Sequence, residues 1–251
     1  MSDTFLIPMK ARGSRWYKGV TNEHFRWETR RAMGLSNQCA CLWFHPTAAW
    51  DNDWPIFSHI TTAASYIGWS VLSRPTQSLR LRWGADEDRR SFETLTNIYE
   101  LNKWNFMVVN LQRDGNATLW INDMTTPLIN EVMSADAAID WGNGPTTWML
   151  GISSSSVSMP MKVAQCGLII GNTFSSDDRA ELYGGGRGIR FNAMSAGLKT
   201  KFSTTEDFFE LRERSGDPIN AVTGGASRSL HQHSSSTRIY TIGYSGPPRR
   251  A

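Results

Sequence analysis

The chain has 251 residues, of which 40% are hydrophobic and 11 are Trp, so it can bury one substantial core or, at most, the cores of two small domains. The net charge of +3 is mild. It argues against a direct nucleic-acid partner, because such proteins present a clustered basic face. No apolar run approaches the ~18 residues of a membrane span, so we expect no membrane partner.

The cysteine count and the N-terminal stretch bear on the cellular compartment. The three cysteines, Cys39, Cys41 and Cys166, are an odd and low number, which predicts buried, reduced thiols. The opening sequence MSDTFLIPMKARGSRW lacks the apolar segment of a secretion signal. We therefore expect a protein that is made in a cytoplasm.

Residues 1–22 carry four Lys or Arg residues and one acidic residue, which predicts a basic N-terminal arm. The alternative is a tail without fixed structure, because chain ends are ordered only where something holds them. Arg and aromatic side chains are typical of protein interfaces, so the arm is a candidate contact region. Its candidate interface residues are Arg12, Arg15, Trp16, Tyr17 and Lys18.

Strand patterns begin near Phe25. Residues 38–44 (QCACLWF) are apolar on both faces, which predicts a strand that is covered on both sides and ends at Pro46. Turn residues separate the later apolar runs at the spacing of an all-β protein. Further strands are expected at residues 54–60, 66–72, 92–95, 104–111, 117–121, 147–152 and 163–170.

Residues 79–83 (LRLRW) alternate strictly between apolar and basic side chains. This pattern predicts a half-buried strand whose outer face is basic. Arg80 and Arg82 on that outer face are a second set of candidate interface residues.

The clearest local signal lies in residues 103–123. Asp114 and Gly115 stand between two runs in which apolar side chains recur, and an Asp-Gly pair in that position is a strong hairpin signal. Later in the chain, Ser175 offers an N-cap with a carboxylate at Asp178, and three glycines follow Tyr183. These features predict one short helix near residues 177–183. Residues 198–202, 208–211 and 238–244 are possible strands.

Four segments, in this order, resemble the jelly rolls of laminin-G-like and concanavalin-A-like domains. They are CLWFHP at 41–46, the hairpin at 103–123, TWMLGIS at 147–153 and VAQCGLIIGNTFSSDDRAELYGGG at 163–186. A later stretch, DFFELRERSGDPINAVTG at 207–224, resembles one that accompanies such domains in bacterial-virus sequences.

The resemblance implies an all-β fold, a two-sheet antiparallel β-sandwich with one short helix and extended terminal arms, of the kind found in bacteriophage structural proteins. It divides the chain into a basic arm (1–22), a jelly roll (23–186) and a C-terminal extension that adds edge strands and a tail (187–251).

Many relatives of such domains bind Ca²⁺ at the sandwich rim, and the stretch Asp51-Asn52-Asp53 could supply oxygens. Ca²⁺ takes about six to eight oxygen ligands, and no second acidic loop pairs with this one, so we favour a turn and expect neither metal nor cofactor. Exposed aromatic side chains can stack on sugars. The possible glycan-binding residues are therefore Trp50, Asp51, Asp53 and Trp54, with partial burial of the Trp side chains as the alternative.

The sequence shows no catalytic pattern. Glu210 and Glu213 are three residues apart and would face opposite sides of a strand, whereas glycosidase carboxylates share one cleft. The spacing of His231 and His233 could suit a metal, but no third ligand lies nearby in the sequence. We therefore expect no enzymatic activity.

Together these patterns favour a non-enzymatic structural protein of a virion, a capsid decoration or cement protein that binds the particle through its arms. Its expected partners are capsid or tail subunits and further copies of itself, and its expected location is the virion, after synthesis in the host cytoplasm. The alternative is a carbohydrate-binding, lectin-like module or a tail or fibre adhesin.

Overall fold

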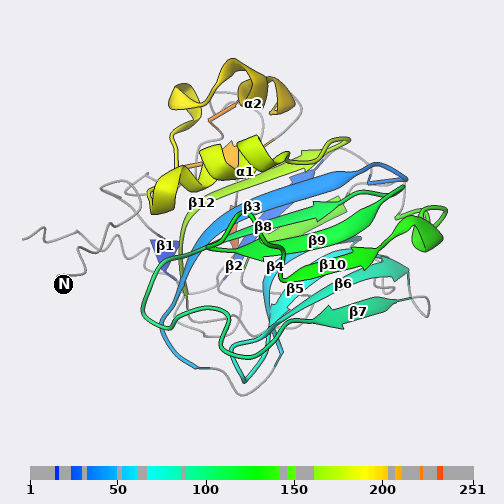
Figure 1. The fold of residues 1–251 in the computed structure, drawn as a ribbon, viewed down its shortest axis with the longest axis horizontal. Coiled ribbons are helices and arrows are strands. Elements are labelled where there is room, and N and C mark those ends of the chain that lie inside the picture. Colours follow the sequence, from blue (N-terminus) through cyan, green and yellow to red (C-terminus); the bar gives the residue numbers. More distant parts are fainter. Residues whose placement is uncertain are drawn as a thin grey trace, which may run out of the picture.

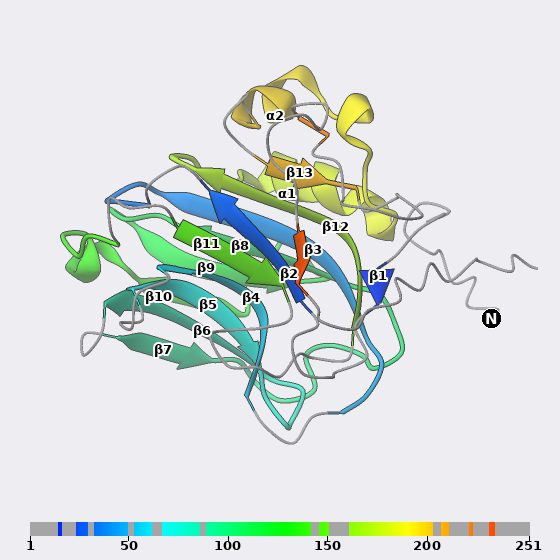
Figure 2. The same cartoon turned by 180° about the vertical axis from the view of Figure 1, so that it is seen from behind.

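The computed structural model describes residues 15–16, 24–29, 33–49, 53–61, 67–85, 89–141, 146–150, 161–202, 207–210, 221–222 and 231–233. Two β-sheets pack face to face, and short helices lie over the outer face of one of them (Figure 1). The view from behind shows the other sheet, the one that the helices do not cover, in front (Figure 2). The predicted all-β, two-sheet antiparallel sandwich is confirmed.

The first sheet has seven strands in the order β1-β12-β3-β8-β9-β10, with β13 also paired to β12. All pairs are antiparallel. The strands are β1 (Arg15–Trp16), β3 (Gln38–Pro46), β8 (Asn105–Leu111), β9 (Asn116–Ile121), β10 (Ile129–Val132), β12 (Met161–Ile170) and β13 (Asp207–Phe209).

The second sheet also has seven strands, in the order β14-β2-β11-β4-β5-β6-β7, and is antiparallel throughout. Its strands are β2 (His24–Thr29), β4 (Trp54–Thr61), β5 (Ile67–Ser73), β6 (Leu79–Ala85), β7 (Arg90–Glu93), β11 (Thr146–Leu150) and β14 (His231–His233). β10 and β7 are edge strands of the two sheets. They contact each other, so both edges lie on the same side of the sandwich.

The hairpin predicted within residues 103–123 is confirmed as β8 and β9. Leu111 pairs with Ala117, and the amide of Gly115 donates to the carbonyl of Gln112 at 3.0 Å, which closes the turn. β10 then pairs with β9 and forms the edge of the first sheet, a strand that the sequence pattern did not indicate.

β3 explains why the sandwich has two apolar clusters. Ala40, Leu42 and Phe44 point between the sheets and belong to the main core. Cys39 and Trp43, on the other face of the strand, belong to a second cluster outside the sandwich. The prediction that residues 38–44 are covered on both sides is confirmed, because every residue from Gln38 to Phe44 is buried.

The second cluster is covered by helices (Figure 1). α1 (Ser176–Tyr183) is the predicted helix, with reciprocal capping bonds between Ser175 and Asp178 and with Gly184 in the left-handed conformation at its end (φ 56°). α2 (Ala196–Lys201) follows, and 3₁₀ turns stand at Ser134–Asp136, Gly184–Gly186 and Phe191–Ala193. We call residues 174–202 the helical cap.

The strand predicted at residues 198–202 is wrong, because this segment forms α2 and the residue after it. The side chain of Ser195 accepts a hydrogen bond from the amide of Leu198 at 3.2 Å and caps the helix. Leu198 and Phe202 are both buried against the first sheet. The side chains of residues 198–202 alternate with a period of two, which is typical of a strand, and this pattern led to the wrong prediction.

A buried polar bridge joins the two sheets inside the main core. Gln38 on β3 accepts hydrogen bonds through its Oε1 from Trp69 Nε1 at 2.7 Å and from His59 Nδ1 at 2.8 Å. Trp69 Nε1 donates only, so Oε1 is the acceptor and His59 donates from Nδ1. Burial lowers the pKa of His59 to about 3, so its imidazole is neutral.

The three cysteines are buried and form no disulfide, as the count predicted. Burial raises the pKa of the Cys41 thiol to about 12, which keeps it protonated. No helix within the described residues is long and apolar enough to cross a membrane.

Candidate binding surface

The candidate surface is built on β6. Leu79, Leu81 and Trp83 are buried in the main core, whereas Arg80 and Arg82 alternate with them on the outer face of the second sheet. The predicted half-buried strand with a basic outer face is therefore confirmed. The side chains of Arg80 and Arg82 are 17% and 31% exposed, so both lie at the surface with part of their length covered.

Strand register brings Asp53 to these arginines. Trp54, the first residue of β4, pairs with Ser73, and Ser73 pairs with Leu79. Asp53 therefore lies level with the turn between β5 and β6, which carries Arg74.

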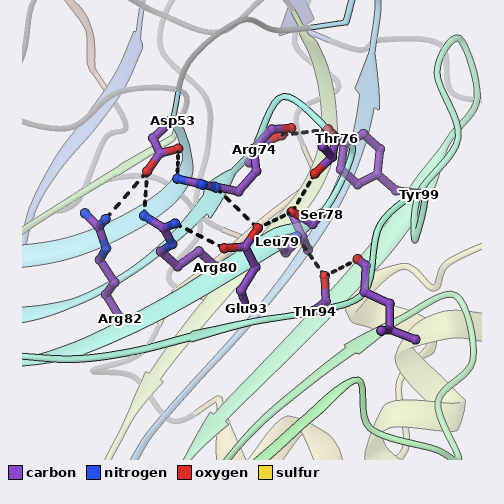
Figure 3. Close-up of polar contacts among 12 residues, drawn as sticks. Asp53, Arg74, Thr76, Ser78, Leu79, Arg80, Arg82, Glu93, Thr94 and Tyr99 are labelled. Atoms are coloured by element: carbon purple, nitrogen blue, oxygen red, sulfur yellow. Dashed lines mark hydrogen bonds and ion pairs between the residues drawn. The ribbon is translucent and has the colours of Figure 1, made fainter.

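Asp53 is the centre of the cluster (Figure 3). Arg80 Nη1 contacts Asp53 Oδ2 at 2.8 Å, and Arg82 Nη2 contacts the same oxygen at 3.5 Å. Arg74 Nη1 pairs with the other oxygen, Oδ1. One carboxylate thus holds three guanidinium groups that come from a turn and from alternate positions of one strand.

Glu93, the last residue of β7, is the second anion. It stands directly opposite Arg80 in the sheet and accepts from Arg80 Nη2 at 3.1 Å and from Arg74 Nε at 3.3 Å. The hydroxyl of Ser78 donates to Glu93 at 2.7 Å. This hydrogen bond, together with the arginines, lowers the pKa of Glu93 and keeps it ionised.

The turn that carries Arg74 is itself fixed. The amide of Arg74 donates to the carbonyl of Ser78 at 3.0 Å, and the amide of Gln77 donates to the carbonyl of Arg74 at 3.1 Å. Gln77 has a positive φ of 55°, which closes the turn. We call Arg74, Arg80 and Arg82, with Asp53 and Glu93, the arginine face.

The arginine face suits an anionic partner. Three positive and two negative side chains leave one net positive charge, and all five side chains are partly exposed. Each guanidinium group has five N–H donors in a planar fork, and the ion pairs with Asp53 and Glu93 engage two nitrogens of Arg74 and two of Arg80. The guanidinium planes are already oriented, so a carboxylate or phosphate meets donors that need little reorganisation.

Of the residues proposed from sequence for glycan or calcium binding, the structure describes Asp53 and Trp54. Asp53 is surrounded by three arginines, an environment that disfavours a Ca²⁺ ion. Trp54 is partly buried and packs against the main core, as the alternative expected. Trp50 and Asp51 lie outside the described residues.

The arm residues proposed from sequence are described in part. Arg15 and Trp16 form β1, whose backbone pairs with β12 at Val163 and Lys162, respectively. Arg12, Tyr17 and Lys18 lie outside the described residues. Sequence reasoning missed Arg74 and Glu93, because their places depend on strand pairing and neither stands out in its own segment.

The described residues contain no group of three or more His, Cys, Asp or Glu side chains that could hold a metal ion. Glu210 accepts a hydrogen bond from the amide of Phe191 at 2.9 Å, a contact that ties the end of β13 to the helical cap. Glu213 lies outside the described part of the chain.

No protein-family model matches the sequence, and a search of curated proteins finds no match either. Solved structures do match. The sialidase of Trypanosoma rangeli, in complex with 2,3-difluorosialic acid, is 11% identical with a TM-score of 0.54, over 68% of this chain and 27% of that one.

Two further matches are a heptameric SAP-like pentraxin from Limulus polyphemus and the binding domain of botulinum neurotoxin serotype G. The pentraxin is 12% identical with a TM-score of 0.49, over 68% of this chain and 82% of that one. The toxin domain is 15% identical with a TM-score of 0.45, over 68% of this chain and 46% of that one. At these identities the sialidase match speaks to the fold alone, and that fold is a jelly-roll-like β-sandwich.

Proposed function

We propose that this chain is a non-enzymatic structural protein of a virus particle, a capsid decoration or cement protein that binds the particle surface. The observation that carries the proposal is the arginine face: three guanidinium groups held in place on the outer face of a rigid sheet. Its partner would be an acidic surface formed by other virion proteins.

Prior orientation is what suits the arginine face to binding. A free Arg side chain loses about 2 kcal/mol of rotamer entropy when it is fixed. Here Asp53 and Glu93 already restrict Arg74 and Arg80, so much of that cost is met during folding. Arg is also among the residue types that dominate binding energy at protein interfaces.

The N-terminal arm supports the same function. β1 shows that this segment is able to add to a sheet edge through its backbone. Ordering an arm costs conformational entropy, and the backbone hydrogen bonds of strand addition can offset that cost. Exposed ion pairs offset it less well, because each contributes only about 0–1 kcal/mol.

The test uses the whole 251-residue chain, co-expressed with the capsid and tail proteins of a candidate virus, and counts copies of the chain on purified particles. Arg82→Gln removes one positive charge through the residue that has the longest contact to Asp53, 3.5 Å. Losing one charge-assisted contact should weaken attachment roughly tenfold.

Arg187→Gln is the matched control, because Arg187 is exposed on the helical cap, away from the arginine face. It should leave occupancy unchanged. Equal losses from both variants would point to net charge alone, and a chain that never purifies with particles would contradict the proposed function.

The second candidate is a carbohydrate-binding module. The observation that favours it is the same set of oriented guanidinium groups, which fits a carboxylated or sulfated sugar as well as an acidic protein surface. An array of acidic and neutral glycans separates the two functions. Binding of acidic glycans by the isolated chain, lost in Arg82→Gln, would favour the sugar.

A further inference from the structure

The second sheet ends on one side in β7, whose outer edge is the subject here. Within the described residues, β7 pairs with β6 and with no other strand. On the opposite side of the sandwich, by contrast, short strands add to β12 and to β2. Figure 1 shows β7 along the lower edge of the second sheet. A strand edge of this kind offers backbone donors and acceptors to another strand.

The hydrogen bonds of β7 show which of its residues face that edge. The amide of Thr94, directly after β7, donates to the carbonyl of Leu79 on β6 at 2.9 Å. In an antiparallel ladder, the backbone groups of successive residues point alternately to the two sides of the strand. Phe92 therefore bonds toward β6, like Thr94, whereas the backbone groups of Ser91 and Glu93 point out of the edge.

The side chains along this edge form a charge pattern that is complementary to itself. Glu93 lies on the outer face of the sheet, where it pairs with Arg80, and Ser91 lies two residues earlier on the same face. Arg89, two residues earlier again, is exposed. At equal spacing in an extended chain, the edge thus presents a positive charge, a small hydroxyl and a negative charge. The same pattern in reverse matches it with opposite charges aligned.

A second copy of the chain supplies that reversed pattern. When two β7 strands run antiparallel about a two-fold axis at Ser91, each Ser91 lies opposite the other. Arg89 of each copy then lies opposite Glu93 of the second copy, so two ion pairs form across the junction. This register also pairs the backbone groups that point out of the edge, so the hydrogen bonds and the ion pairs favour the same alignment.

Exposed apolar side chains lie on the same side of the sandwich. Of four large apolar side chains exposed among the described residues, three lie next to or within β7 and β10: Leu95 (85%), Leu128 (40%) and Val132 (64%). Arg90, which begins β7, contacts Asp136, just beyond β10, at 3.2 Å, so the two strands run close together. A second copy joined at β7 would lie beside these side chains and remove apolar surface from water.

We propose that this chain forms a two-fold symmetric dimer through β7, in which the second sheets of two copies join into one continuous antiparallel sheet. The partner of the β7 edge is a second copy, recognised by backbone pairing and by two ion pairs between Arg89 and Glu93. Because the two-fold axis is perpendicular to the sheet, both arginine faces lie on the same side of the dimer. The dimer does not depend on the proposed function, but it doubles the charge that an acidic partner would meet.

The first experiment exchanges charges between copies of the whole 251-residue chain. In Arg89→Glu a carboxylate lies opposite Glu93 of the second copy, and in Glu93→Arg a guanidinium group lies opposite Arg89. Each variant alone should therefore dimerise about tenfold more weakly than the wild type in analytical ultracentrifugation.

An equimolar mixture of the two variants provides the decisive measurement. In the heterodimer the introduced Glu lies opposite the introduced Arg, and the native Glu93 lies opposite the native Arg89. The mixture should therefore recover the wild-type dissociation constant to within about threefold. A defect in the folding of either variant would not be repaired by mixing, so recovery reports on the junction itself.

The second experiment uses Ser91→Cys, an exposed substitution that changes the size of the side chain little. The two-fold axis places residue 91 opposite itself, and paired residues of an antiparallel ladder lie ~5.5 Å apart, a separation that permits a disulfide. Mild oxidation should therefore give a disulfide-linked dimer, and the native cysteines are buried and should not interfere. Ser176→Cys, exposed on α1, is the matched control and should give none.

Three results would overturn the dimer: a wild-type chain that is monomeric at every concentration, a mixture that dimerises no better than its two components, or equal crosslinking at positions 91 and 176. A chain that dimerises through β7 but does not purify with particles would contradict the proposed function and leave the dimer standing.

Discussion

The outer faces of the two sheets differ sharply. The first sheet carries apolar side chains on its outer face, and the helical cap buries them. On the second sheet, β6 carries Arg80 and Arg82, which stay at the surface in a network of ion pairs. Within the described residues, the chain covers the outer face of the first sheet and leaves the side chains of Arg80 and Arg82 partly exposed, which is why we propose that binding takes place on the second sheet.

The strongest test of this comparison is Phe202→Ala in the helical cap. Phe202 is 2% exposed, and its ring lies 5.3 Å from that of Phe208 and 5.9 Å from that of Phe174. Removing a buried Phe costs about 3–5 kcal/mol, because it leaves a cavity as well as losing apolar contact. Urea unfolding should show a loss of that size.

Thr200→Ala is the control for Phe202→Ala, because Thr200 is exposed on α2. It should change the free energy of unfolding by less than about 0.5 kcal/mol. If Phe202→Ala costs no more than this control, the helical cap is not part of the folded core and the contrast between the two faces fails.

A pair of glycines tests how tightly the helical cap and β13 meet the first sheet. A Cβ at Gly167 on β12 would lie 2.9 Å from Phe208 and 3.0 Å from Phe202, whereas a Cβ at Gly197 on α2 would meet nothing within 4 Å. Gly167→Ala should therefore destabilise the protein by about 1–3 kcal/mol through overpacking. Gly197→Ala should stabilise it by about 0.5–1 kcal/mol through helix propensity. Thermal or urea unfolding of both variants measures the contrast, and equal effects would contradict it.

The bridge between the sheets predicts a pH dependence. Because the pKa of His59 is about 3 in the folded state and near 6.5 when unfolded, the unfolded chain binds one more proton between these values. The contribution of His59 to the free energy of unfolding is fully present above about pH 6.5. Below that pH it falls by ~1.4 kcal/mol per pH unit. Between pH 7 and pH 5 the loss is about 2 kcal/mol.

His59→Gln isolates this contribution, because Gln keeps a donor toward Gln38 and does not titrate. Urea unfolding at pH 7 and pH 5 should show a loss that is about 2 kcal/mol smaller in the variant. His45, whose pKa burial also lowers, is present in both proteins and cancels in the comparison. Equal losses would mean that His59 is not kept neutral by the core.

The parts of the fold that were predictable follow from local patterns. The strict alternation of residues 79–83 predicted the basic outer face of β6, and the Asp114-Gly115 pair predicted the hairpin. α2 was missed because Leu198, Thr200 and Phe202 alternate with lysines, a strand-like period, while the deciding cap lies earlier, at Ser195.

The arginine face was only half predictable. Arg80 and Arg82 follow from alternation within one strand, but their contact with Asp53 depends on the order β4-β5-β6 and on its register. Glu93 likewise reaches Arg80 only because β7 pairs with β6. Strand order is a property of the whole sheet, and no single segment encodes it.

The smallest expected effect concerns the arginine face itself. Arg80 makes two ion pairs, to Asp53 at 2.8 Å and to Glu93 at 3.1 Å, at a partly exposed site. Pairs of this kind are screened by water and salt, so Arg80→Ala should cost no more than about 1 kcal/mol in urea unfolding, and less in high salt. Arg187→Ala, on the exposed helical cap, is the control and should cost nothing measurable.

A small loss of stability together with a large loss of particle attachment is what separates a binding surface from a structural network. A loss above about 2 kcal/mol would instead show that the arginines serve the fold, as the apolar face of the first sheet does.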